Sequence, residues 1–129
     1  MADPLPPAGR DLDALVAEKV MGWINVKKQS IANAFGQHVM DDYVGQPSIA
    51  ATQPVLIPRY SSMIQEAWKV ADKLRAESQF VAVISGTGPN GAQPWICKIN
   101  REGSFLEERA DTAPLAICLA ALKAVSPTT

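Results

Sequence analysis

Four consecutive residues, from Arg59 to Ser62, carry the side chains best suited to holding an anion. Arg59 supplies a guanidinium, Tyr60 a phenol, and Ser61 and Ser62 two hydroxyls, directly before a segment with helical periodicity. The first N–H groups of a helix have no partner inside it, so a helix start attracts phosphates and other anions. We expect a ligand site there. The alternative is an ordinary capped helix with a surface arginine and a core tyrosine.

Trp23 and Trp95 each stand near the end of a predicted element, where an indole ring can face a pocket or a partner. We therefore add both to the candidate ligand-binding residues. Trp68 differs, because it lies at the centre of an apolar helical stripe, and we expect it in the core.

The sequence offers no catalytic set. His38 is the single imidazole, and no serine stands in a G-x-S-x-G elbow. Glu107 and Glu108 are adjacent on a predicted strand, so they point to opposite faces and cannot flank one substrate bond. We expect no catalytic residue and no enzyme activity.

The cysteines and the histidine do not predict a metal site. Cys97 and Cys118 are set among apolar neighbours and are expected to be small buried hydrophobes. Structural zinc sites draw four closely spaced ligands. The remaining metal hypothesis joins His38, Asp41 and Asp42, and a polar loop through HVMDDYVGQ is the favoured interpretation of that stretch. We predict neither a metal nor a cofactor.

A single domain is expected over residues 11–125, with tails at 1–10 and 126–129. An apolar stripe predicts a helix over Asp11–Met21, and a capping box at Ser62 and Gln65 begins a second helix that runs to about Glu77. Residues 26–57 form a variable excursion without a strong pattern. Short elements are predicted in that part of the chain: strands at Ile24–Val26 and Val55–Ile57, and a turn of helix at Ile31–Phe35.

Three strands and a last helix complete the predicted domain. Phe80–Ile84, Trp95–Ile99 and Phe105–Arg109 predict an antiparallel meander, with the glycine-rich GTGPNG as a hairpin turn that lacks the Lys-Ser/Thr of a phosphate loop. Phe80–Ile84 is apolar on both alternating faces, and Leu115–Val125 is apolar nearly all round. The predicted fold class is α+β: an α/β/α sandwich with a small, mainly antiparallel three- to four-stranded sheet covered by helices on both faces.

Charge and hydropathy exclude several partners. The chain of 129 residues has 12 Lys and Arg against 13 Asp and Glu, a net charge of −1, which disfavours a dedicated binder of long nucleic acids. Although 47% of the residues are hydrophobic, no apolar run is long enough to cross a membrane, and the start lacks a signal-peptide pattern. We expect a protein of the cytoplasm with no membrane partner.

Three segments carry a family resemblance: Ala14–Trp23, Pro58–Ser62 leading into Ala67–Val70, and Ala110–Cys118. In that order they resemble the phage ABA-sandwich domain family, small proteins of bacteriophages and prophages. The family tends to place a variable, often aromatic and charged insert after the tryptophan, where this chain carries Val26–Pro54. The resemblance implies the α/β/α sandwich and a location in the bacterial host cytoplasm. It implies no activity and no cofactor.

Two hypotheses about function follow. The first is a non-enzymatic phage accessory protein that counters host defence by sequestering a nucleotide-derived signalling molecule near Arg59 and Tyr60. The alternative is a protein–protein interaction module that inhibits a host protein, such as a defence protein, or serves the phage programme without any small-molecule ligand. A homo-oligomer is compatible with both.

Overall fold

The computed structural model describes residues 9–32, 34–77, 80–85, 94–101 and 104–125. These residues form three helices and two three-stranded antiparallel sheets, in the strand orders β1-β2-β3 and β4-β5-β6. The elements are α1 (Arg10–Lys19), β1 (Ile24–Ala32), β2 (His38–Gln46), β3 (Val55–Leu56), α2 (Ile64–Glu77), β4 (Phe80–Ser85), β5 (Trp95–Arg101), β6 (Ser104–Ala110) and α3 (Ala113–Val125).

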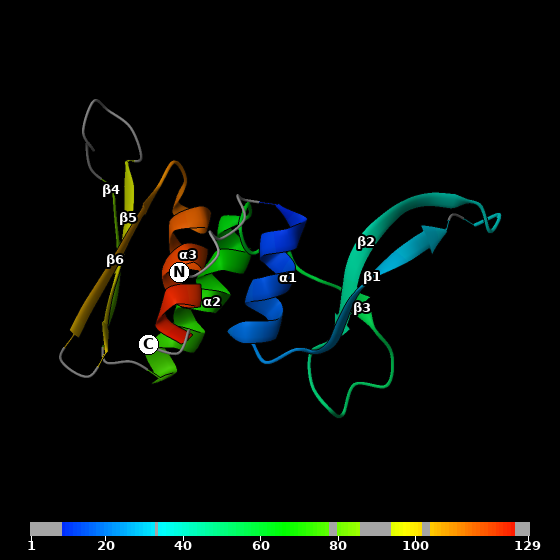
Figure 1. Cartoon of the computed structure of the whole chain (residues 1–129), viewed down its shortest axis with the longest axis horizontal. Helices are drawn as coiled ribbons and strands as arrows, with labels where there is room; N and C mark the ends of the chain where they lie inside the picture. Colours follow the sequence, from blue (N-terminus) through cyan, green and yellow to red (C-terminus); the bar gives the residue numbers. More distant parts are fainter. Residues whose placement is uncertain (1–8, 33, 78–79, 86–93, 102–103, 126–129) are drawn as a thin grey trace, which may run out of the picture.

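The three helices lie between the two sheets (Figure 1). α2 and α3 pack on the β4–β6 sheet, while α1 contacts α3 on one side and β1 and β2 on the other. The predicted α+β class is therefore confirmed. Helices on both faces of one sheet are not confirmed, because α2 and α3 lie on the same face of the β4–β6 sheet (Figure 1).

Burial explains why the helical segments fold as they do. α1 buries one stripe, with Leu12, Val16 and Ala17 fully buried, and the chain turns at Gly22, where φ is +79°. α3 is apolar nearly all round because it packs against α1, α2 and all three strands of the β4–β6 sheet. The core therefore sits around α3.

Residues 26–57 contain more structure than their pattern indicates. The strands predicted at Ile24–Val26 and Val55–Ile57 are present as the start of β1 and as β3, but Ile31 and Ala32 continue β1, so the predicted helical turn is wrong. HVMDDYVGQ is the strand β2 and not a loop. β1 and β2 carry register irregularities and are mostly exposed, so they show no clean alternation.

The paired strands β1 and β2 form an arm that projects from the helical body (Figure 1). At its base, Gly45 is buried against Trp23, Val26 and Ile57, and a Cβ atom on this glycine would lie 3.0 Å from Val26 Cγ2 and 3.2 Å from Trp23 Cε3. Since these neighbours belong to the packed base of the arm, only glycine fits without displacement.

Gly45→Ala is expected to lower the free energy of unfolding by about 1–3 kcal/mol, because the added methyl group overpacks the base of the arm. Urea denaturation of the full chain measures the change. Ser48→Ala, at an exposed position in the turn that follows, is the control and should stay within about 0.5 kcal/mol of the wild type. Equal urea midpoints for Gly45→Ala and the wild type would show that Gly45 is not packed at the base of the arm as described.

Candidate functional site

The structure does not bring the four side chains of Arg59–Ser62 together on one surface. Tyr60 is 2% exposed, and its hydroxyl is hydrogen-bonded to the side chain of Trp23. Burial, followed by the charge of Glu66, raises the pKa of Tyr60 to about 12, so the phenol stays protonated. Arg59 and Ser62 are exposed. They are the two predicted residues of this segment that a ligand can reach.

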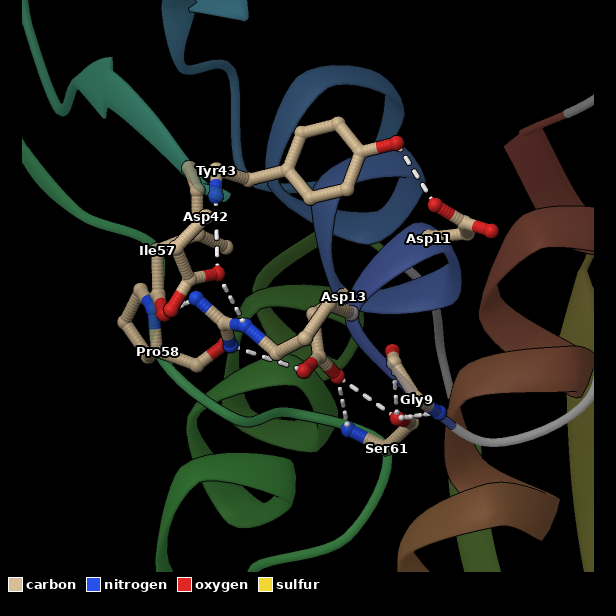
Figure 2. A network of polar contacts seen from close by, with 9 residues as sticks. Gly9, Asp11, Asp13, Asp42, Tyr43, Ile57, Pro58 and Ser61 are labelled. Carbon is tan, nitrogen blue, oxygen red and sulfur yellow. Dashed lines mark hydrogen bonds and ion pairs between the residues drawn. The ribbon is translucent and has the colours of Figure 1, made fainter. Parts of the chain in front are cut away.

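Ser61 is fully buried and serves the fold. Its backbone N–H and its hydroxyl both donate to Asp13 Oδ1, at 2.7 and 2.6 Å, and its hydroxyl accepts a hydrogen bond from the Gly9 N–H at 2.9 Å. Figure 2 shows this serine between the start of α1 and the segment that leads into α2. The hydroxyl that was predicted to meet a ligand thus connects two elements of the protein.

A buried ion-pair network continues from Asp13 through Arg10. The Arg10 guanidinium donates to Asp42 Oδ1 at 2.7 Å, to Asp13 Oδ2 at 2.9 Å and to the Ile57 carbonyl at 2.6 Å. The Asp13 and Asp42 side chains are 1% and 6% exposed, and that of Arg10 is 21% exposed. These contacts, drawn in Figure 2, join α1 to β2 and to the chain that enters α2.

Asp42 is held in its charged form. Burial alone would raise the pKa of this carboxyl group, but the hydrogen bonds from Arg10 and from the Tyr43 N–H, with the charges of Arg10 and Arg59, bring the pKa below 3.8. A lowered pKa contributes stability above the unfolded value of about 4, and the contribution is lost as the pH falls through the folded value. The ion pair between Arg10 and Asp42 therefore stabilises the fold at neutral pH.

The residues of the metal hypothesis do not converge. His38 Nδ1 lies 2.6 Å from the Ser30 hydroxyl, and His38 Nε2 lies 3.8 Å from Asp41 Oδ1, whereas Asp42 turns to Arg10. Within the described ranges, no three His, Cys, Asp or Glu residues form a group that could hold a metal ion.

The cysteines and the paired glutamates are placed as the sequence indicates. Cys97 and Cys118 are free and fully buried, and burial raises the pKa of both thiols. Glu108 pairs with Lys123 on α3, while Glu107 pairs with Lys98 on the opposite face of the sheet. Neither arrangement assembles a nucleophile with a base.

A groove between α2, the β4–β5 hairpin and the start of α3 is a candidate ligand site, because two tryptophans line it. Its volume is about 380 Å³, and its walls are almost entirely apolar. Trp95, one of the predicted ligand residues, lines it together with Trp68, and we call it the tryptophan groove. Its residues are Ile64, Trp68, Val83, Trp95, Thr112, Ala113 and Pro114.

Trp68 is the functional candidate that the sequence interpretation missed. It was expected in the core, but it is 49% exposed, and Ile64, one turn earlier, is 42% exposed, so both lie at the edge of the apolar stripe of α2. Trp23, by contrast, packs against the core and is hydrogen-bonded to Tyr60. The sequence feature that could have identified Trp68 is the width of the apolar stripe on α2, which is greater than the part of the helix that packs against the core.

Comparison with known proteins places the chain among phage proteins. A model of the phage ABA sandwich domain matches residues 14–122. The chain belongs to the phage ABA sandwich domain family. The resemblance drawn from the three segments is thus confirmed.

The chain is also similar to a phage protein known from a crystal structure. This phage protein from Bacillus cereus ATCC 14579, solved at 2.0 Å, is similar with a TM-score of 0.63 and 26% identity, over 95% of this chain and 94% of that one. No curated protein gives a significant match. Among the described helices, none is long and apolar enough to cross a membrane.

Arg10→Met is expected to lower the free energy of unfolding at neutral pH by about 3–5 kcal/mol, because it removes the cation that is hydrogen-bonded to two buried carboxylates. Urea denaturation followed by circular dichroism measures it. Arg75→Met is the matched control: Arg75 pairs with Asp72, both side chains are 67% exposed, and the change should stay below about 1 kcal/mol. Similar decreases in the free energy of unfolding for the two variants would contradict a stabilising role of the Arg10 ion pairs.

Proposed function

We propose that this member of the phage ABA sandwich domain family is a non-enzymatic accessory protein that binds a nucleotide-derived signalling molecule of the host. By sequestering the signal it would counter host defence. The observation that carries the proposal is the tryptophan groove, in which the indole rings of Trp68 and Trp95 line one apolar cavity.

The dimensions and chemistry of the groove favour a flat ring over other small ligands. Its volume of about 380 Å³ falls at the lower end of the usual range of ligand pockets, roughly 300–1,000 Å³. Indole faces stack on nucleobases, and each stacked base contributes about 1–3 kcal/mol. Such walls bind a ring without supplying a nucleophile or a base, which supports binding without turnover.

The polar groups that we propose for the ligand's phosphate come from the segment before the groove. Ser62 and Arg59 lie on the segment just before Ile64, which lines the groove, and both are exposed. We assign the ligand's phosphate to these two side chains, while Tyr60 and Ser61 support the segment from inside. A net charge of −1 is compatible with a single nucleotide but unfavourable for a long polyanion.

The test is a titration of the full chain with cyclic oligonucleotides and cyclic ADP-ribose isomers, followed by calorimetry and thermal shift. Trp68→Ala is expected to weaken the binding of the active ligand by roughly 5- to 150-fold, the equivalent of about 1–3 kcal/mol of stacking. Met40→Ala, which removes an exposed apolar side chain on the arm, should bind like the wild type. The proposal fails if no compound stabilises the wild type, or if Trp68→Ala binds equally well.

The arm favours a second candidate, the protein–protein interaction module. It projects from the body (Figure 1), and it exposes the apolar side chains of Phe35, Val39 and Met40 at its outer part. Exposed hydrophobic side chains on a projecting arm favour an interaction with a partner. This candidate needs no small-molecule ligand.

A Val39→Asp/Met40→Asp variant separates this candidate from the first. If the arm binds a host protein, the wild type should recover one stoichiometric partner from host lysate, and the variant should lose it while retaining the wild-type circular dichroism spectrum. A Lys69→Ala variant, changed at an exposed position on α2, should recover as much as the wild type. Equal recovery by the arm variant would rule out the arm as the surface.

A further inference from the structure

The β4–β6 sheet has an outer face that none of the described helices covers (Figure 1). Its inner face is identified by Cys97 and Ile99, which are fully buried in the core, and by Glu108, which pairs with Lys123 of α3. Since side chains alternate along a strand, the neighbouring positions point outward. The described residues whose side chains point outward are Ala82, Ile84, Ile96, Lys98, Asn100, Phe105, Glu107 and Arg109.

Several of these outward positions are apolar. Phe105 is 73% exposed and Ile84 is 42% exposed, while Ile96, between Ile84 and Arg109 in the pairing register, is 8% exposed without belonging to the central core. A strand that is apolar on both faces is typical of a sheet covered on both sides. The described helices of this chain cover one side only, which leaves the second side open to a partner surface.

The charges at the middle of the outer face match a second copy of the same face. Lys98 and Glu107 are paired in register on β5 and β6, with Nζ and Oε1 3.7 Å apart, and each side chain is nearly half exposed. A two-fold axis that runs along the strands between β5 and β6 places Lys98 of one copy over Glu107 of the other, and the reverse contact follows by symmetry. The Lys98–Glu107 pair is therefore complementary to its own symmetry copy.

A free strand edge offers a less suitable route to self-association. β1 forms one edge of the β1-β2-β3 sheet and carries the exposed Lys27 and Lys28. Lysines on an edge strand discourage pairing with another chain, and two copies in antiparallel pairing would bring these like charges together.

We propose that two copies of the chain associate through the outer face of the β4–β6 sheet, sheet against sheet, around a two-fold axis. The exposed apolar side chains Ile84 and Phe105 supply the buried area, and the doubled Lys98–Glu107 contacts fix the register. The proposal does not depend on what binds in the tryptophan groove.

Charge reversal tests the proposal without altering the core. Light scattering after size-exclusion chromatography, at about 10 and about 100 µM of full-length protein, is expected to give twice the 13.8 kDa chain mass for the wild type at the higher concentration. Lys98→Glu should be monomeric, because it places four carboxylates around the axis. The double variant Lys98→Glu/Glu107→Lys should recover the dimer, because the exchanged charges are again complementary.

The control is Arg75→Glu, which makes the same change of charge on the exposed side of α2 and should leave the dimer intact. Circular dichroism checks that each variant is folded, which is expected because an exposed ion pair contributes little to stability. A monomeric wild type at 100 µM, a dimer that survives Lys98→Glu, or a double variant that stays monomeric would each overturn the proposal.

Discussion

The ion pairs of Arg10 are the constraint on which the arrangement of the rest depends. The β1-β2-β3 sheet buries few apolar side chains of its own, and a hairpin without a core is marginal in water. Arg10 connects this sheet to α1 through Asp42, and Asp13 connects α1 to Ser61 at the approach to α2. Because one guanidinium serves both carboxylates, the arm and the start of α2 are positioned together.

Elements with local burial patterns could be predicted from the sequence, whereas elements fixed by distant contacts could not. The apolar run predicted as a helix from Leu115 is α3, and the predicted strands of the meander are present, since the core lies beside each of them. β2 was missed because burial does not alternate regularly along it, so its sequence shows no clean alternating pattern. The contact that holds it in place joins Asp42 to Arg10, 32 residues away in sequence.

The sequence predicted the candidate site from its residue types alone. Which contacts these residues make depends on the fold. Ser61 has the chemistry of an anion ligand, but Asp13, 48 residues earlier, takes both its hydroxyl and its N–H. Trp68 has the pattern of a core residue, yet it lines an open groove and is 49% exposed. Periodicity identifies an apolar side of a helix, but it does not say which part of that side another element will cover.

The tryptophan groove and the proposed dimer face lie on opposite sides of the same strands. Val83 and Trp95 point toward the helices and line the groove, whereas their neighbours Ile84 and Ile96 point outward. Alternation along β4 and β5 thus separates the two surfaces. A second copy stacked on the outer face would leave the groove open, so a dimer would carry two grooves facing away from each other. Ligand binding and self-association are therefore compatible in one assembly.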